Sequence, residues 1–177
     1  MTHYVSFLRA INVGNRRVTM SRLREIYEQL ELENVASFIA SGNVLFDSPK
    51  KPAELESMIE KELESELGYS VDTFVRKFKD IQSIATEKMF EQDGLPGYVI
   101  HVAFLRKKIS PAIQKRWEGM QSELDEFRFD GTELYWLYQG RVSDSKFWSS
   151  KEFKSLEVPP MTMRNITSIR KLVAQFE

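Results

Sequence analysis

The sequence contains no cysteine among its 177 residues. The chain can therefore form no disulfide, thiolate nucleophile or cysteine-ligated metal site, and it fits a reducing compartment. Histidine is almost as scarce, since His3 and His101 are the two in the chain. A zinc site would need several carboxylates to join them, and a Ser-His-Asp triad has few candidates. We therefore predict no metal site.

An excess of charge of one sign is also lacking. The chain has 25 Lys and Arg against 26 Asp and Glu, a formal net charge of -1. This balance supplies no general attraction for nucleic acid or anionic lipid, so we expect neither as a partner. No stretch approaches the roughly 18 uncharged residues that a membrane helix needs. Arg9 interrupts the apolar amino-terminal run and no small-residue cleavage site follows it, so we expect a strand there and a soluble, cytoplasmic protein.

What the sequence does contain is a repeated run. Val5-Ser6-Phe7-Leu8-Arg9 in the first half is answered by Val102-Ala103-Phe104-Leu105-Arg106 in the second. Each run is followed by a helix-like segment and a hairpin pattern. The repetition predicts two similar halves related by duplication, and ligands commonly bind where such halves meet.

The first half, residues 1–90, predicts the order β-α-β-β-α-β, which is that of ferredoxin-like units. We expect a buried strand over 3–11, a helix capped by Thr19, a hairpin around Ser41-Gly42-Asn43, a helix from Pro52 to Gly68, a strand over 71–78 and a short helix over 80–86. Residues 91–97 are polar and are broken by Gly94, Pro96 and Gly97, so they predict a linker.

The second half, residues 98–177, predicts a related unit. We expect a strand over 98–105, a helix opened by Ser110-Pro111, a hairpin turning at Asp130-Gly131, a helix from Asp144 to the residues before Pro159, and a closing helix over 163–176 where a further strand would complete the pattern. The predicted fold class is therefore α+β, with two ferredoxin-like subdomains and a C-terminal helix.

The start of the closing helix has unusual electrostatics. If Thr162 caps it, Arg164 lies in the first turn, where the helix dipole repels a cation by about 0.3–1 kcal/mol. Asn165 falls at the edge of the apolar stripe, where its amide needs partners. An arginine, an amide and free backbone N–H groups at one helix start form an anion site in the general sense. The alternative is that Arg164 pairs with a carboxylate of the protein and that Asn165 ties down the 41–43 hairpin.

Arg9 and Arg106 end the two strands that we predict to be buried. A buried arginine needs an anionic partner, which is either a ligand or an internal carboxylate. The following stretch, Asn12-Val13-Gly14-Asn15-Arg16-Arg17, resembles an anion cradle. It has neither the GK[ST] of a P-loop nor the GxGxxG spacing of a dinucleotide site, so its functional signal is weak.

Aromatic residues in the second hairpin offer a different interpretation. Phe127, Phe129, Trp136 and Tyr138 could stack RNA bases on a sheet face or contact another protein. No RNP1-like run accompanies them, and core packing is the alternative. No serine lies in GxSxG, and arginine and asparagine are poor proton shuttles, so the sequence shows neither an acid nor a base for catalysis.

Three motifs together resemble a known family. They are the run from Phe7 to Gly14 (FLRAINVG), the run from Ser41 to Phe46 (SGNVLF), and Thr162-Met163-Arg164-Asn165 with Arg170-Lys171-Leu172. The chain resembles the bacterial domain of unknown function sixteen ninety-seven, whose members read close to LRGINVGG, SGNVxF and TxRNWxTxxKL. The chain has Ala10 and Asn15 where the family usually has glycine, and Ile166 where it usually has tryptophan. The resemblance implies two α+β subdomains of related type, and it implies no activity or cofactor.

Our leading hypothesis from the sequence is a protein that binds a small anionic ligand, phosphorylated or nucleotide-like, between its subdomains. An interaction module for protein or RNA, working through the aromatic hairpin of the second half, is the alternative. The motif residues that we predict to contact the ligand are Arg9, Asn12, Gly14, Ser41, Asn43, Arg164, Asn165 and Lys171.

Overall fold

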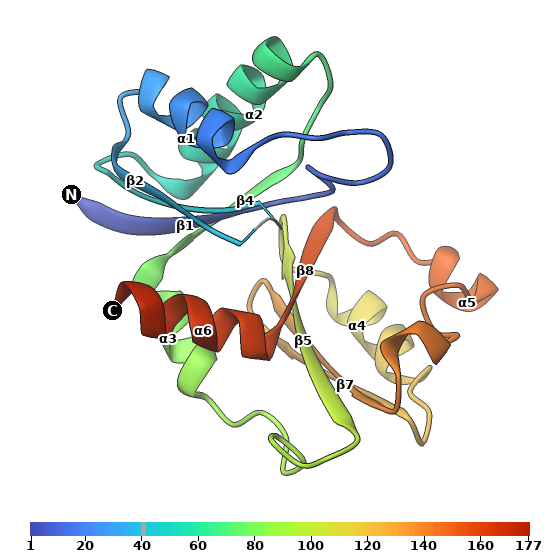
Figure 1. Ribbon diagram of the computed structural model, residues 1–177. Helices are drawn as coiled ribbons and strands as arrows, with labels where there is room; N and C mark the ends of the chain where they lie inside the picture. Colours follow the sequence, from blue (N-terminus) through green and yellow to red (C-terminus); the bar gives the residue numbers. More distant parts are fainter. Residues whose placement is uncertain (40–41) are drawn as a thin grey trace. The chain divides into compact units, whose positions relative to one another are not determined.

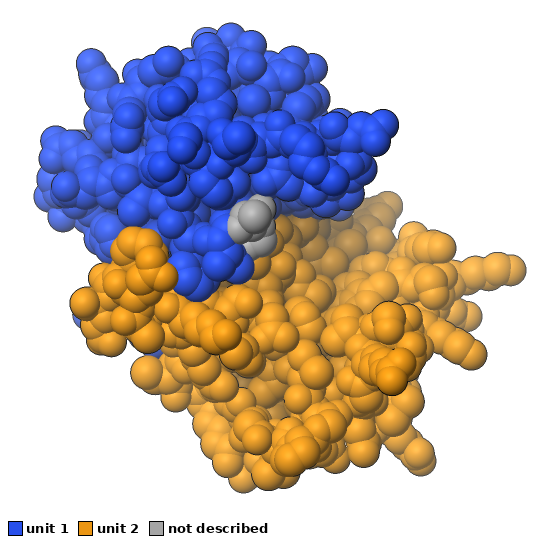
Figure 2. Space-filling model, viewed as in Figure 1, with its two compact units in different colours: residues 1–84 blue, residues 85–177 orange. Residues whose placement is uncertain are grey.

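The computed structural model describes residues 1–39 and 42–177 and divides into two compact units, Met1–Ile84 and Ala85–Glu177 (Figure 2). The segment 91–97, which the sequence predicts as a linker, falls within the second unit. Two contacts fasten it there. Gly97 O accepts a hydrogen bond from Gly140 N at 2.8 Å, and the Asp93 carboxylate pairs with the Arg170 guanidinium at 2.5 Å.

The first unit has the ferredoxin-like order. Its elements are β1 (Thr2–Leu8), α1 (Met20–Gln29), β2 (Glu33–Phe38), β3 (Asn43–Ser48), α2 (Pro52–Leu67) and β4 (Thr73–Lys77), and α3 (Phe78–Thr86) follows them. The strands form one sheet in the order β2-β3-β1-β4, and all neighbouring pairs are antiparallel. Helices α1 and α2 lie on the same face of this sheet (Figure 1).

Local signals in the sequence place both helices. The Thr19 side chain caps α1 by accepting a hydrogen bond from Arg22 N at 3.1 Å, and Pro52 opens α2. Gly68 ends α2 in the left-handed region, with φ 75, where glycine is favoured. The apolar stripes of both helices are buried against the sheet, and each fully buried aliphatic side chain contributes about 1.5–3 kcal/mol. The buried residues are Leu23, Ile26 and Tyr27 in α1 and Leu55, Ile59 and Leu63 in α2.

Two glutamates of α2 protect the edge of this sheet. Strand β4 is at the edge, so the N–H groups on its outer side have no neighbouring strand. Glu60 Oε1 accepts from Thr73 N at 2.8 Å, and Glu56 Oε1 accepts from Val75 N at 2.9 Å. These carboxylates take the place of a further strand, which lowers the tendency of the edge to pair with another chain.

The second unit repeats the strand order. Its elements are β5 (Tyr98–Leu105), α4 (Pro111–Glu118), β6 (Asp125–Asp130), β7 (Glu133–Gln139), the 3-10 turn η1 (Val142–Asp144), α5 (Lys151–Lys154), β8 (Met161–Asn165) and α6 (Ile166–Phe176). The sheet order β6-β7-β5-β8 is again antiparallel throughout. Helices α4 and α5 lie on one face of this sheet and α6 on the other (Figure 1).

The strand register is equivalent in the two halves. Val5 of β1 is opposite Arg76 of β4, and Val102 of β5 is opposite Arg164 of β8. Arg9 N donates to Asp72 O at 2.9 Å, and Arg106 N donates in the same way to Pro160 O at 2.9 Å. Two similar α+β halves with a C-terminal helix are therefore present, which is consistent with duplication.

The closing helix starts later than predicted. Residues 161–165 form β8, and α6 begins at Ile166, so Thr162 and Arg164 lie in a strand and not at a helix start. Strand pairing explains the difference, because residues 161–165 lie antiparallel to β5, with Met161 opposite Leu105 and Asn165 opposite His101. The expected clash between Arg164 and the helix dipole is thus wrong.

The helix predicted from Asp144 to Pro159 is also wrong, since η1 and the four-residue α5 stand in its place. Serines explain the irregular backbone, because their hydroxyls compete for backbone groups. Ser145 Oγ accepts from Phe147 N at 3.3 Å and Ser149 Oγ donates to Lys146 O at 3.0 Å, whereas Ser150 Oγ caps the short α5 by accepting from Phe153 N at 3.1 Å. In the described residues, no helix is long and apolar enough to cross a membrane.

Candidate functional site

Arg9 lies just beyond the end of β1 and is exposed, so the prediction that it is buried is wrong. The strand ends at Leu8, three residues earlier than expected. Arg9 Nη1 instead donates to Asp72 Oδ2 at 3.1 Å, an internal ion pair at the surface. A pair of this kind contributes little to stability, about 0–1 kcal/mol.

Asn12 and Gly14 belong to the loop that joins β1 to α1. Asn12 Oδ1 accepts from Val18 N at 2.7 Å, and its Nδ2 donates to Val18 O at 3.2 Å, so the amide closes the loop. Gly14 has φ 66 and open space where a Cβ would lie. Both residues therefore have a local structural role, the first as a clamp and the second as a left-handed turn residue.

Asn43 opens β3 and is buried. Its Nδ2 donates to Phe38 O at 3.2 Å, across the connection between β2 and β3. The predicted site residue Ser41 lies outside the described residues. Gly42, the central residue of this motif, has φ 75, and a Cβ there would lie 2.6 Å from Ile11 Cγ2. The packing therefore requires glycine at position 42.

Arg164, Asn165 and Lys171 belong to the second unit. Arg164 Nη1 donates to Thr162 Oγ1 and to Met163 O, both at 2.9 Å. Burial lowers the pKa of the Arg164 guanidinium to about 10, because desolvation disfavours the charged form. Asn165 caps α6, since its Oδ1 accepts from Thr167 N at 2.8 Å. Lys171 is exposed on α6.

Asn165 also lines a small polar pocket of about 230 Å³ with Asp93 and Arg170. Arg170 donates to both carboxylate oxygens of Asp93, at 2.9 and 2.5 Å. This bidentate hydrogen bond lowers the pKa of the Asp93 carboxyl and raises the pKa of the Arg170 guanidinium. The cation of this pocket is therefore matched by an anion of the protein.

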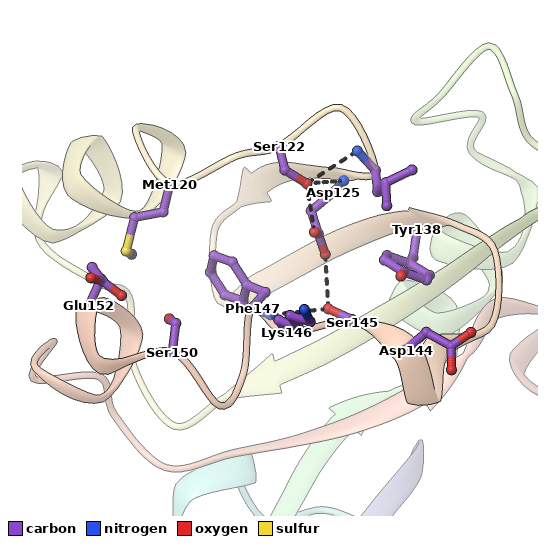
Figure 3. Close-up of a pocket in the computed structure, with 11 residues that line it drawn as sticks. Met120, Ser122, Asp125, Tyr138, Asp144, Ser145, Lys146, Phe147, Ser150 and Glu152 are labelled. Atoms are coloured by element: carbon purple, nitrogen blue, oxygen red, sulfur yellow. Dashed lines mark hydrogen bonds between the residues drawn. The ribbon is translucent and has the colours of Figure 1, made fainter.

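A larger pocket of about 560 Å³ lies on the α4 face of the second sheet (Figure 3). In the second unit the irregular segment 140–160 stands where the first unit has helix α2, and the pocket lies beside this segment. The lining residues are Met120, Ser122, Leu124, Asp125, Tyr138, Asp144, Ser145, Lys146, Phe147, Ser150 and Glu152. A concave site with mostly apolar walls and a few convergent polar groups is the usual form of a small-molecule site.

The floor of this pocket contains a pair of residues on neighbouring strands. Asp125 of β6 is directly opposite Tyr138 of β7, so their side chains share one face of the sheet. Phe127 and Trp136 form the next pair on this face and stack with ring centroids 6.3 Å apart. The pocket is thus the open end of an aromatic core that also contains Trp117, Phe147 and Trp148.

Asp125 is a nearly buried carboxylate, 7% exposed. Its Oδ1 accepts from Trp136 Nε1 at 2.9 Å and from Ser145 Oγ at 3.2 Å, and its Oδ2 accepts from Ser122 Oγ at 2.8 Å. Figure 3 shows it between these two serines, one on each side of the pocket floor. A buried charge needs such hydrogen bonds because it has lost its hydration.

Tyr138 is the second polar group of the floor, with a side chain that is 3% exposed. Burial raises the pKa of its hydroxyl, and the negative charges of Asp125 and Asp144 add to this effect. Within the described part of the chain its hydroxyl has no hydrogen-bond partner. Perturbed pKa values and polar groups without protein partners are typical of ligand sites.

Sequence reasoning missed this pocket, although one signal was present. Alternate residues of β6 are Asp125, Phe127 and Phe129. Since alternate residues of a strand lie on the same face, the carboxylate shares its face with two aromatic side chains. Burial of the aromatic side chains counts against the hairpin as an interaction surface, because Trp136 is 1% exposed and Tyr138 is 3% exposed. The described residues contain no group of three or more potential metal ligands.

Two of three comparisons with known proteins found a match, and both concern the fold. The family model described as "Protein of unknown function (DUF1697)" matches residues 1–135. The solved structure of the conserved bacterial protein SP0830 from Streptococcus pneumoniae is similar, with 21% identity over 99% of each chain and a TM-score of 0.75. A search of curated proteins finds no match. At this identity the structural likeness shows the fold alone.

Proposed function

Because the chain belongs to the DUF1697 family of proteins of unknown function, its function has to be argued from its own geometry, and we propose that it binds a small organic molecule in the 560 Å³ pocket of its second unit. The observation that carries the proposal is the combination of apolar walls with a buried carboxylate and the hydroxyl of a buried tyrosine. Sites of 300–1,000 Å³ with this composition suit small organic ligands.

Two exposed leucines provide a test with a matched control. Leu124 lines the pocket and is 47% exposed, whereas Leu95 is 52% exposed and does not line it. Leu124→Ala removes part of the apolar wall, and we expect ligands found by a thermal-shift screen to bind it about tenfold more weakly than the parent. Leu95→Ala should keep the parent affinity. Equal affinities of all three proteins for every ligand would contradict binding in this pocket.

Anion binding near Arg164 is a second candidate, and the observation that favours it is the lowered pKa of this buried guanidinium. A desolvated arginine gains more than an exposed one from a phosphate or carboxylate. The predicted residues of the second unit that would take part are Arg164, Asn165 and Lys171, with Arg164 and Lys171 as cations. Thermal shifts with pyrophosphate and ATP should be lost in Arg164→Gln and kept in Arg141→Gln, which changes an exposed arginine of the same unit. Equal shifts in the two variants would rule out Arg164 as the anion-binding residue.

A further inference from the structure

The charged groups that line the larger pocket are unequal in sign. Three carboxylates, those of Asp125, Asp144 and Glu152, share the lining with one ammonium group, that of Lys146. In the part of the chain that the structure describes, no basic side chain forms an ion pair with any of these three carboxylates. The lining therefore carries a net negative charge, to which Asp125 contributes a buried carboxylate and Asp144 and Glu152 contribute exposed ones.

Asp125 has hydrogen-bonding capacity left for such an occupant. A carboxylate offers about four acceptor positions, and the donors from Trp136, Ser145 and Ser122 use three of them. These donors are all neutral, whereas a charged donor makes a hydrogen bond about twice as strong. Oδ2, which accepts from Ser122 alone among the described residues, is the atom with room for a further donor.

The surroundings of Asp125 suit the body of such a molecule. The rings of Tyr138 and Phe147 and the exposed Leu124 line the same pocket. Aromatic faces attract a cation within about 6 Å of the ring centroid. Apolar walls with a carboxylate at the floor therefore match a ligand that is apolar at one end and positively charged at the other.

We infer that the ligand of this pocket is an organic amine, with its ammonium group on Asp125 and an apolar or aromatic body against Tyr138, Phe147 and Leu124. This inference rests on the proposed function, because it names the ligand class for the same pocket. A phosphorylated or carboxylate ligand would meet three like charges there, which disfavours it.

Three small probes with one aromatic body test the sign of the charge. They are phenethylamine, 2-phenylethanol and 3-phenylpropionate, each titrated into the full chain labelled with 5-fluorotryptophan. Fluorine NMR then reports on Trp117, Trp136 and Trp148, which all belong to the aromatic core beside the pocket. We expect phenethylamine to bind at least tenfold more tightly than the alcohol, and phenylpropionate to bind most weakly.

Asp125→Asn tests the residue that carries the inference. This change keeps the shape of the side chain and removes its charge, so the amine and the alcohol should bind within about twofold of each other. Asp130→Asn, which removes an exposed carboxylate of the same hairpin outside the pocket, should leave the tenfold preference unchanged. A preference that persists in Asp125→Asn would overturn the role of this carboxylate.

The double variant Asp144→Asn, Glu152→Gln gives an answer even if Asp125→Asn does not fold. It leaves Asp125 and its hydrogen bonds in place and removes two of the three negative charges, so the preference for the amine should fall by about twofold. An unchanged preference would overturn the electrostatic argument. If the alcohol or the carboxylate binds as tightly as the amine in the parent, the amine inference fails while binding in the pocket stands. If no probe shifts any tryptophan resonance, both proposals fail.

Discussion

At the scale of single residues, the family motifs serve the backbone more clearly than they serve a ligand. Gly42 is required because a Cβ would lie 2.6 Å from Ile11 Cγ2 and 3.0 Å from Leu8 Cβ. Ala10 has a φ of 54, which is in the left-handed region. Glycine is favoured in this region, so alanine at position 10 costs about 1–2 kcal/mol.

We expect Ala10→Gly to raise the free energy of unfolding by about 0.5–1 kcal/mol. The substitution relieves the strain of the left-handed backbone. Glycine also loses more conformational entropy on folding than alanine, which offsets part of this stabilisation. Urea denaturation followed by circular dichroism measures the change. Ala53→Gly in α2 is the control, and it should lower stability because helical φ carries no such strain. A destabilised Ala10→Gly would show that residue 10 is not strained.

Two glycines separate backbone strain from packing. Gly14 and Gly42 both have positive φ, but a Cβ at Gly14 would meet nothing within 4 Å. Gly14→Ala should therefore lose about 1–2 kcal/mol, and Gly42→Ala should lose about 1–3 kcal/mol more through overpacking against Ile11 and Leu8. The comparison is again made by urea denaturation. Equal losses would mean that the chain around Gly42 moves away without cost.

At the scale of elements, contacts between side chains far apart in the sequence fix segments whose position the hydrophobic pattern does not predict. The glutamates of α2 cover the edge of β4, and Asp93 with Arg170 fastens the segment 91–97 to α6. Neither contact is visible in the sequence, because each depends on which surfaces come together after folding. Helix caps and hairpin turns, in contrast, are local, and Thr19, Ser110 and Gly68 were predictable for that reason.

The ion pair between Asp93 and Arg170 should make stability depend on pH in a defined direction. The pKa of Asp93 is lowered in the folded state, whereas in the unfolded chain it is about 3.9. The unfolded state therefore binds the proton first, so the stabilisation is complete above the unfolded pKa and is lost as the pH falls through the lowered folded value. The free energy of unfolding of Asp93→Asn should approach that of the parent between pH 5 and pH 2. Asp130→Asn serves as the control, and a constant difference across this range for Asp93→Asn would contradict the ion pair.

At the scale of the whole molecule, the sequence predicted the α+β class, the ferredoxin-like order and the similarity of the halves. These features follow from hydrophobic periodicity and from the repeated strand, which are local or internal to the chain. The prediction failed in the segment 140–165, where serine hydroxyls bind the backbone locally and residues 161–165 pair with β5. The pocket arises in that same segment, so the error about the fold and the missed site have one cause.

The missing helix should be visible in amide hydrogen exchange. Helix α2 has sixteen residues with a buried stripe, whereas the corresponding part of the second unit has η1 and the four-residue α5. Amides with few regular hydrogen bonds open at low free energy. We expect the amides of 142–156 to exchange at least about tenfold faster than those of 55–67. Equal protection would show that the irregular segment is as firmly held as the helix.

The segment 138–152 lies beyond the part of the chain that the family model matches. The match ends at residue 135, while most of the pocket lining, from Tyr138 to Glu152, comes after it. Most of the residues that would select a ligand therefore lie outside the part of the chain that the family model matches. Membership of the family is then no guide to the compound that this pocket would take, and that compound has to be inferred from residues 138–152 themselves.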